Sequence, residues 1–361
     1  MRVGLIADDV TGAGDASVQF AKRGWETFLT LGTVPRAGAG DGDRVIALTT
    51  DSRALDNETA FELTRGALAR LMEAGVDRVF LKIDSTMRGS VPGQVEGALA
   101  AWRIRHAGAR AVVCPAYPRM GRTVRAGRLL VNGEPVEHTA IGRDPVTPVR
   151  TSDMNVLVPA SPAISMADAE SDAALAAVAA GIAAGGPPAI AVGSGGLAEA
   201  LARALSANED AGRAVPVRTR RAQAENPRIL VLVTSLNPVS HAQVARLRAE
   251  CPGIAVVLAP AERVGDTSVA DTLAAEFADR VERGRWDLVG LVGGDGARAA
   301  LARLGASGIR IFDSLVEGIP LGAIVGGKAD GLPVFTKAGG FGAEDALVEA
   351  VRAEKPGGGE K

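Results

Sequence analysis

The sequence predicts an α/β protein of two domains, each built on a largely parallel β-sheet flanked by helices. Its 361 residues exceed what a single hydrophobic core usually serves. Short runs rich in Val and Ile alternate with Ala-rich helical stretches, the pattern of parallel sheets covered on both faces. Residues 206–226 are highly charged and poor in apolar side chains, so we expect them to link a domain at 1–205 to one at 227–353. We expect residues 354–361 to form a disordered tail.

The individual elements follow from the length and period of each apolar run. The predicted strands are residues 2–7, 44–49, 78–83, 111–114, 155–158 and 189–193, followed by 228–233, 254–258, 288–292, 309–312 and 334–336. The predicted helices are residues 57–73, 92–102, 166–184, 238–250, 267–283 and 343–353. Residues 119–149 are rich in Gly, Pro and Arg and predict a long loop, of a length that is usually functional or mobile.

The composition argues against several classes of function. A net charge of −2 offers no basic surface for nucleic acid, and 3% aromatic residues offer few platforms for base stacking. The first apolar run, residues 2–7, is too short for a signal peptide or a membrane span, so we expect a cytoplasmic protein without a membrane partner. Cys114 and Cys251 match no metal-ligand spacing and are simplest to interpret as free thiols in a reducing compartment.

Three strand–helix junctions of the second domain have turns that suit an anion. They read Thr-Ser-Leu-Asn-Pro (234–238), Gly-Gly-Asp-Gly (293–296) and Lys-Ala-Gly-Gly-Phe-Gly (337–342). Glycine lets backbone N–H groups approach a phosphate, and a helix N-terminus adds partial positive charge. Lys337 is one of six lysines among 40 basic residues, so its place in such a turn favours a polyphosphate ligand. One such turn alone could have its glycines only because the chain turns tightly there, but three in one domain favour a phosphate site.

Carboxylates follow the first predicted strand directly. Asp8 and Asp9 end the apolar run, and Asp15 lies a few residues further on. Adjacent carboxylates repel a phosphate, but they accept hydrogen bonds from sugar hydroxyls or bind Mg²⁺. The alternative is that Asp8 and Asp9 are solvated turn residues and that Asp15 is a charge near a helix start. Two carboxylates at the end of a buried strand are costly without partners, which favours a binding role.

The densest group of polar residues follows the third predicted strand. Lys82 and Arg88 form a cationic pair that can hold a carboxylate, with Arg able to bind it through two hydrogen bonds. Asp84 and Ser85 add groups that recognise hydroxyls. The alternative is an internal Lys82–Asp84 pair beside a capped helix. Arg53 lies at an equivalent strand end and is expected to join the same pocket.

The two halves of the chain therefore carry different chemistry. Carboxylates and a cationic pair gather in the first half, and Gly-rich turns with a lysine gather in the second. Loops at the carboxyl ends of parallel strands open onto a common crevice, so we expect the two sets to face an interdomain cleft. The chain has no GxxxxGK[ST] motif and no GxGxxG at its strand–helix turns, so it is neither a P-loop protein nor a typical dinucleotide-binding protein.

In these residues the chain resembles the four-carbon acid sugar kinase family, whose members phosphorylate threonate, erythronate or 3-oxo-tetronate with ATP. Motifs of the family occur in order nearly from end to end: ADDVTGAGD (7–15), KIDSTMRG (82–89), CPAYPRMGRTV (114–124), DPVTPV (144–149), VGSGGLAEAL (192–201), TSLNPVS (234–240), VGGDGARA (292–299), EGIPLG (317–322) and KAGGFG (337–342). The resemblance implies an N-terminal acid-sugar domain, a C-terminal nucleotide domain, ATP and Mg²⁺ as cofactors, and phosphoryl transfer to a terminal hydroxyl.

The family's motifs fall on named positions of this sequence. Its substrate motifs match Asp8, Asp9, Arg53, Lys82, Asp84, Ser85 and Arg88. Its nucleotide motifs match Ser235, Gly293, Gly294, Asp295, Gly296, Gly339 and Gly340, and the turn chemistry adds Lys337. The chain departs from the family at Thr234 and Gly296, where members often have Gly and Thr. Gly296 lacks the hydroxyl of that Thr, and its loss removes one contact to phosphate or Mg²⁺. The sequence assigns no Mg²⁺ ligand.

The implied reaction needs positioning and charge neutralisation more than covalent chemistry. Lys82 and Arg88 are predicted to hold the substrate carboxylate, Asp8 or Asp9 to orient its hydroxyls, and domain closure to exclude water. One aspartate must accept the proton of the attacking hydroxyl. Asp8, Asp84 and Asp295 are the candidates, and the sequence does not choose among them.

Two other functions stay open at this point. A ribokinase-like sugar kinase would use the Gly-Ala-Gly-Asp run at 12–15 as anion hole and base, although that family has the motif late in its chain. A non-catalytic sugar-acid sensor would leave three phosphate-type turns unexplained. The stereochemistry of the acceptor and the oligomeric state are also open, with a homodimer among the alternatives.

Overall fold

The computed structural model of the chain describes residues 1–32, 34, 42–206, 226–260 and 268–353. Its contacts divide the chain into two units, Met1–Thr27 with Val34–Arg213 and Phe28–Thr33 with Ala214–Lys361. Nearly all of the predicted linker, residues 206–226, and the whole predicted tail lie outside the described residues. The interdomain cleft stays a prediction.

Six parallel strands form the sheet of the first unit. In spatial order they are β3 (Arg44–Thr49), β1 (Arg2–Ala7), β4 (Arg78–Lys82), β10 (Ala189–Gly193), β5 (Arg110–Cys114) and β9 (Ile164–Met166). The central strands are buried along almost their whole length, because helices cover both faces of the sheet. Five strands predicted for this domain are confirmed with end shifts of at most one residue.

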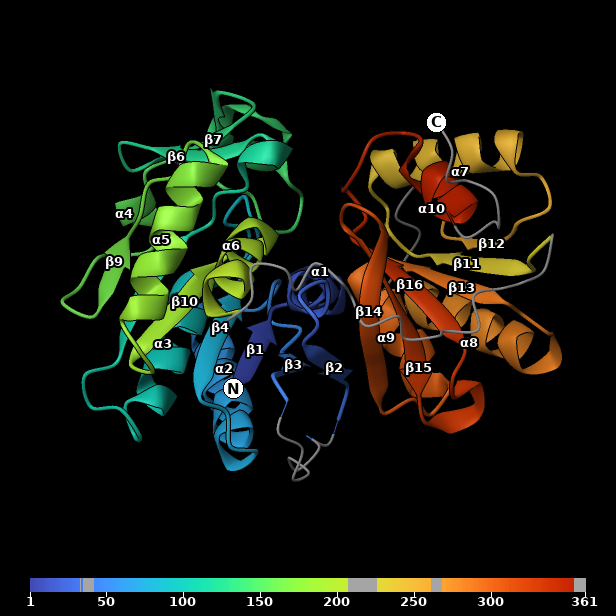
Figure 1. Ribbon diagram of the computed structural model, residues 1–361. Helices are drawn as coiled ribbons and strands as arrows, with labels where there is room; N and C mark the ends of the chain where they lie inside the picture. Colours follow the sequence, from blue (N-terminus) through green and yellow to red (C-terminus); the bar gives the residue numbers. More distant parts are fainter. Residues whose placement is uncertain (33, 35–41, 207–225, 261–267, 354–361) are drawn as a thin grey trace. The chain divides into compact units, whose positions relative to one another are not determined.

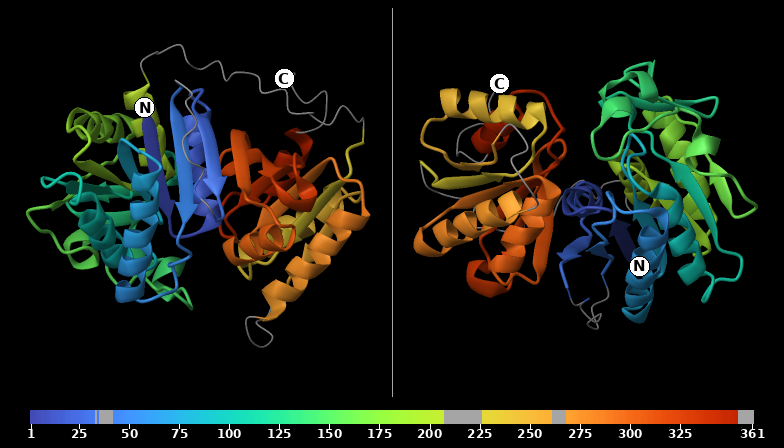
Figure 2. Two further views of the ribbon diagram at one scale, coloured as in Figure 1. Left: turned by 90° about the horizontal axis from the view of Figure 1, so that it is seen from below. Right: turned by 180° about the vertical axis from the view of Figure 1, so that it is seen from behind.

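Two groups of helices cover this sheet. The helices α1 (Val10–Ala21), α5 (Asp172–Ala184) and α6 (Gly195–Leu205) lie on one face, and α2 (Asn57–Glu73) and α3 (Val91–Trp102) lie on the other (Figures 1 and 2). Side-chain oxygens cap four of them, because Asp9, Asp56, Ser171 and Ser194 accept from backbone N–H groups of α1, α2, α5 and α6. The predicted α/β class is confirmed.

Two glycines let α2 and α3 approach each other closely. Gly93 of α3 lies against the carbonyl of Asn57, and Gly97 lies against the carbonyl of Phe61. A Cβ on Gly93 would overlap the Asn57 oxygen and lie 2.8 Å from its carbonyl carbon. Because both neighbouring atoms belong to the backbone, a side chain at Gly93 forces the two helices apart.

Gly93→Ala is therefore expected to lower the free energy of unfolding by about 2–3 kcal/mol, the cost of overpacking a close backbone contact. Denaturant titration of the full chain measures this change. Gly66→Ala is the matched control, because Gly66 is exposed on α2 and a Cβ added there would meet no other atom within 4 Å. The control is expected to gain about 0.5–1 kcal/mol through helix propensity. Equal stability of the two variants would contradict the packing account.

The prediction of a loop at residues 119–149 is wrong in part. Three short strands, β6 (Arg122–Arg125), β7 (Arg128–Val131) and β8 (Glu134–Pro135), form an antiparallel sheet of their own. Each of their two turns has two consecutive residues with positive φ, first Ala126-Gly127 and then Asn132-Gly133. Such turns match the twist of a two-residue hairpin and bring the strands together. The short 3₁₀ helices η1 (Pro118–Met120), η2 (Val136–His138) and η3 (Ala140–Arg143) flank the hairpins.

Two further expectations in the first unit are wrong. The strand predicted at 155–158 is a helical turn, α4 (Met154–Leu157), because the Asp153 side chain accepts from the Asn155 N–H and caps it. The helix predicted from residue 166 begins only at Asp172. The residues before it form β9 and a connection that ends at the Ser171 cap.

The second unit has a mixed sheet. Its parallel strands are β12 (Ala255–Leu258), β11 (Ile229–Val233), β13 (Leu288–Val292) and β16 (Pro333–Lys337), followed in spatial order by the antiparallel strands β15 (Ile319–Val325) and β14 (Gly308–Val316). The strand β15 is not predicted. It exists because Gly318, at φ 72°, turns the chain back beside β14.

The helices of this unit also form two groups. The helices α7 (Pro238–Glu250) and α10 (Ala346–Ala353) contact each other, and α8 (Ser268–Arg283) packs on α9 (Gly294–Arg303). The 3₁₀ helix η4 (Gly327–Ala329) follows β15. One segment of this unit comes from the N-terminal half of the sequence. It includes the end of β2 (Glu26–Thr30), an unpredicted strand, and the Leu31 N–H donates to the Ser307 carbonyl at 3.0 Å.

Candidate active site

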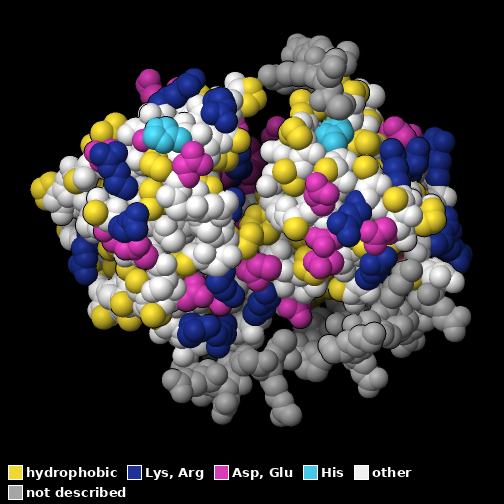
Figure 3. All heavy atoms as spheres, turned by 90° about the horizontal axis from the view of Figure 1, so that it is seen from above, with side chains coloured by type: hydrophobic (Ala, Val, Ile, Leu, Met, Phe, Trp, Pro, Cys, Tyr) yellow, Lys and Arg dark blue, Asp and Glu magenta, His cyan; other side chains and the backbone are white. Residues whose placement is uncertain are grey.

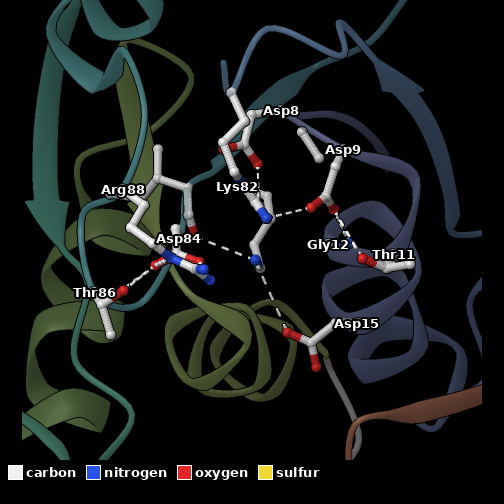
Figure 4. A network of polar contacts seen from close by, with 12 residues as sticks. Asp8, Asp9, Thr11, Gly12, Asp15, Lys82, Asp84, Thr86 and Arg88 are labelled. Carbon is white, nitrogen blue, oxygen red and sulfur yellow. Dashed lines mark hydrogen bonds and ion pairs between the residues drawn. The ribbon is translucent and has the colours of Figure 1, made fainter. Parts of the chain in front are cut away.

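Side chains from three strand ends meet at one edge of the first unit's sheet. Asp8 and Asp9 follow β1, Arg53 follows β3, and Lys82 and Asp84 stand at the end of β4. These strands are parallel neighbours, so their carboxyl ends share one edge. Figure 4 shows the resulting network of carboxylates and cations.

Arg53 binds both aspartates that follow β1. Its Nε and Nη2 donate to the two carboxylate oxygens of Asp8 at 2.8 and 2.7 Å, and its Nη1 pairs with Asp9. Asp9 also accepts hydrogen bonds from the Gly12 N–H and the Thr11 hydroxyl at the start of α1. Asp8 is only 1% exposed, so the alternative of a solvated turn residue does not hold for it.

Arg88 binds a second pair of carboxylates. Its Nη2 and Nε donate to Asp84 at 2.7 and 3.3 Å, and its Nη1 donates to Asp144 at 3.4 Å. Asp84 also accepts from the backbone N–H of Thr86, at 2.9 Å, and from its hydroxyl. Ser85 is half-buried in this turn, and its hydroxyl has no hydrogen-bond partner among the described residues.

Lys82 has a longer ion pair than Arg53 and Arg88 have. Its side chain is buried, and its Nζ donates to the Ile83 carbonyl at 3.1 Å. The carboxylate of Asp15 lies 4.0 Å away, at the outer limit of an ion pair. Asp84 pairs with Arg88, so the alternative of an internal Lys82–Asp84 pair is wrong for the described residues. Figure 4 shows the Lys82 amine between Asp15 and the Asp84–Arg88 pair.

The surroundings separate the pKa values of the three aspartates. Burial raises the pKa of Asp8, and the charge of Arg53 offsets this only in part. Burial also acts on Asp84, but Arg88 and Arg53 outweigh it and hold the Asp84 pKa well below its usual range. The pKa of Asp9 is lowered as well, because Arg53, Lys82 and hydrogen bonds together outweigh burial. Asp8 is therefore the one of the three whose pKa is raised.

Two charged residues at this cluster lie outside the predicted set. Asp144 accepts from Arg88, and Arg122 is close enough to Asp84 and Arg88 for their charges to act on its pKa, which burial lowers. Both lie in residues 119–149, where a long loop is predicted. The signal in the sequence is that each belongs to a family motif, CPAYPRMGRTV or DPVTPV.

The three predicted turns of the second unit converge. They follow β11, β13 and β16, which are neighbouring parallel strands. The Gly293 N–H donates to the Lys337 carbonyl at 3.1 Å, and the Ser240 hydroxyl on α7 donates to the Gly339 carbonyl at 2.7 Å. The side-chain amide of Gln243 donates to three carbonyls of the last turn, the shortest bond being 2.7 Å.

Glycines make this convergence sterically possible. A Cβ on Gly339 would lie 2.6 Å from the Ser235 Cβ, and one on Gly293 would lie 3.0 Å from the Ser235 nitrogen. A Cβ on Gly296 would overlap the Thr234 side chain. Gly293 has φ 105°, which a residue with a side chain rarely adopts. Side chains at these glycine positions would therefore push the turns apart.

Backbone donors gather at these turns. The N–H groups of Gly294, Asp295 and Gly296 open α9, and they have no acceptor among the described residues. The same holds for the N–H groups of Gly339 and Gly340. The Asp295 side chain is exposed. Clustered N–H groups at a helix N-terminus suit an anion such as a phosphate.

Comparison with known proteins decides the family. Models of a sugar-binding N-terminal domain and a nucleotide-binding C-terminal domain match residues 3–163 and 259–347. The chain is 37% identical to D-threonate kinase of Bordetella bronchiseptica over 97% of both chains. The chain belongs to the four-carbon acid sugar kinase family. A 3-oxo-tetronate kinase of Burkholderia multivorans is 26% identical over 97% of both chains.

Structural comparison agrees with this membership. A solved structure from Bordetella bronchiseptica, described as a domain of unknown function with bound citrate in a domain-swapped dimer, is 36% identical. It covers 98% of both chains with a TM-score of 0.52. As an acid sugar kinase family member the chain is a phosphotransferase, which confirms the predicted family and enzyme class. Membership sets aside the ribokinase-like and sensor alternatives.

In the described part of this acid sugar kinase family member, no helix has the length and apolar character needed to cross a membrane. Figure 3 shows basic and acidic side chains interspersed over the face in view, in keeping with a net charge of −2. Its described residues also contain no group of three or more His, Cys, Asp or Glu side chains placed to hold a metal ion.

Proposed function

We propose that this chain transfers the γ-phosphoryl group of ATP to the terminal hydroxyl of a four-carbon acid sugar. The observation that carries the proposal is Lys82, a buried amine that lies 4.0 Å from the carboxylate of Asp15. The carboxylate of a small acid would give Lys82 a closer ion-pair partner than Asp15, whereas a neutral sugar would not. The names of the relatives support threonate and 3-oxo-tetronate as acids to test first.

Cations bind the carboxylate of the acid, and hydrogen-bonding side chains bind its hydroxyls. Lys82 and Arg88 bind its carboxylate, and Arg88 keeps part of its surface exposed for this contact. Asp9 and Ser85 bind its hydroxyls. Arg53 fixes the carboxylates that follow β1, so their orientation is set before the substrate arrives. These roles match residues of the first domain, proposed at 1–205.

Asp8 is the proposed proton acceptor. A general base is most effective when its pKa lies near the working pH, and burial moves the Asp8 pKa upward. Asp84 is a poorer acceptor because Arg88 and Arg53 hold its pKa well below the usual range of a carboxyl. Asp295 is exposed at the start of α9, beside the proposed phosphate site.

The nucleotide binds to the second domain, proposed at 227–353. The N–H groups at 293–296 and 339–340 hold the triphosphate together with Ser235, and Lys337 supports the last turn. The close approach of the glycine turns, and their N–H groups without an acceptor in the described chain, fit this group. Mg²⁺ bound with the triphosphate would neutralise part of its charge. No side chain is assigned to the metal.

A coupled assay of ADP release tests the proposal. The acids are D- and L-threonate, D- and L-erythronate and the 3-oxo-tetronates, each with Mg-ATP. Release with at least one acid and none with the parent neutral sugars is expected. An absence of release above the ATP background with every acid would contradict the proposal.

Lys82→Met is expected to raise the KM for the acid by about 10- to 100-fold. This range corresponds to the usual free energy of a hydrogen bond to a charged group. The Kd for Mg-ATP should not change, because Lys82 belongs to the acid site. Steady-state kinetics and calorimetry measure the two quantities. Lys328→Met is the matched control, because Lys328 is 64% exposed and pairs with Glu282 at 2.8 Å. If Lys82→Met weakened acid binding and Mg-ATP binding equally, the assignment of Lys82 to the acid site would be wrong.

A further inference from the structure

Lys337 is a buried lysine with an unusual set of partners. It ends β16, its side chain is fully buried, and its Nζ donates to the carbonyls of Ala338 at 2.8 Å and Gly339 at 3.1 Å. No ion pair among the described residues includes it. Its amine therefore bonds to the inner side of the turn that follows it.

Donors other than Lys337 also hold this turn. The Phe341 N–H donates to the Ala338 carbonyl at 3.2 Å, and the Ser240 hydroxyl donates to the Gly339 carbonyl at 2.7 Å. In a planar trans peptide the C=O and the following N–H point in opposite directions. When Lys337 and Ser240 bind these carbonyls, the N–H groups of Gly339 and Gly340 point away from Lys337. Neither N–H has an acceptor in the described chain.

No side chain of the described residues forms an ion pair with this amine. Burial lowers the pKa of Lys337 to about 7, and no charged side chain contributes to the shift. The charged or titratable residues on the elements around β16 include His241, Asp295, Arg298, Asp313, Glu317 and Asp345. A polyphosphate bound at the neighbouring N–H groups would be the nearest strong negative charge, and it would favour the protonated amine.

We propose that Lys337 is a positioning residue for the proposed nucleotide site: it directs the N–H groups of Gly339 and Gly340 toward the phosphates and takes up a proton when the polyphosphate binds. Lys337 acts through the turn, because its amine bonds to the turn's carbonyls. This role depends on the proposed function, which the wild-type arm of the test examines separately.

Calorimetric titration of the full chain with Mg-ATP tests the positioning. Lys337→Met is expected to weaken binding at least ten-fold. Ser240→Ala retains the lysine but removes the other donor to the Gly339 carbonyl, and it should weaken binding by about two- to ten-fold. Lys328→Met, a surface control, should bind as the wild type does. Acid affinity should be unchanged in all three.

Proton uptake during Mg-ATP binding tests whether Lys337 becomes protonated. At pH 8 the titrations are repeated in two buffers of different ionisation enthalpy, which gives the number of protons taken up. An amine with a pKa near 7 is mostly neutral at pH 8, so wild-type binding should take up most of one proton. Ser240→Ala and Lys328→Met should retain this uptake, and Lys337→Met should lose it.

The outcomes separate the two claims. Wild-type-like affinity in both Lys337→Met and Ser240→Ala would overturn the positioning role. Equal proton uptake in wild type and Lys337→Met would overturn the charge role, even if Lys337→Met binds weakly through a folding defect. A wild type that does not bind Mg-ATP would instead overturn the proposed function.

Discussion

Asp8→Asn is expected to lower kcat by about 10²- to 10⁴-fold, the usual contribution of a positioned general base. The substitution keeps the shape of the side chain and removes its ability to accept a proton. An Asn oxygen can still receive one hydrogen bond from Arg53, so the acid should bind within about ten-fold of wild-type affinity. The effect should therefore fall on kcat more than on KM.

The pH dependence gives an independent readout of the same claim. A base works only in its deprotonated form, so kcat/KM of the wild type should fall as the pH drops through the Asp8 pKa. Burial raises that pKa above its usual value, which moves the acidic limb of the profile upward in pH. Asp8→Asn should lose this limb, because the titrating group is absent.

Asp56→Asn is the matched control. Asp56 is exposed and caps α2, and Asn caps a helix about as well as Asp does. Its kcat and pH profile should equal those of the wild type. A kcat of Asp8→Asn within five-fold of wild type would show that another group accepts the proton, and Asp84→Asn and Asp295→Asn would then be the variants to measure.

Gly339→Ala is expected to weaken Mg-ATP binding by about 5- to 150-fold, the equivalent of about 1–3 kcal/mol of overpacking. The new Cβ would lie 2.6 Å from the Ser235 Cβ, so the two turns must separate. Both turns belong to the proposed phosphate site, and their separation misplaces the N–H groups that hold the anion. Acid affinity should not change.

The control for this variant is Gly253→Ala in the same unit. Gly253 is exposed, and a Cβ there meets no atom within 4 Å, so nucleotide affinity and stability should stay near the wild-type values. Calorimetry gives the affinity, and thermal unfolding shows that Gly339→Ala remains folded. Unchanged Mg-ATP binding by folded Gly339→Ala would remove this turn from the nucleotide site.

The positions of the candidate site residues could be predicted because polar residues directly follow apolar strands. Asp8 and Asp9 after β1, and Lys82 and Asp84 at the end of β4, needed only the strand ends and the parallel order of the sheet. Their pairing could not be predicted in the same way. Arg88 bonds to Asp84 because the intervening turn folds back, and no pattern in the sequence gives that geometry.

The hairpins in residues 119–149 were within reach of sequence reasoning. Asn132-Gly133 is the dipeptide most typical of a two-residue hairpin, and it directly follows the short apolar run of β7. The Gly, Pro and Arg content of the region instead predicts a loop. As a result Arg122 and Asp144, which lie in this region, were not assigned to the site.

Lys337 illustrates a different limit. A lysine beside two glycines in a turn predicts a phosphate contact, because its charge and the backbone donors suit the same ligand. Whether the side chain points toward the ligand or under the turn depends on packing. In the structure it is buried and bonds to two carbonyls, which only the folded chain defines.

Phosphorus NMR of the reaction product tests the central claim most directly. The wild-type chain is incubated with Mg-ATP and the acid that gives the greatest ADP release. We expect a new phosphomonoester signal that is coupled to the two protons of a terminal CH₂ group, and an acid product one phosphoryl group heavier by mass. A signal coupled to a single proton would place the phosphate on an internal hydroxyl, and no new signal with any acid would contradict acid sugar phosphorylation by this chain.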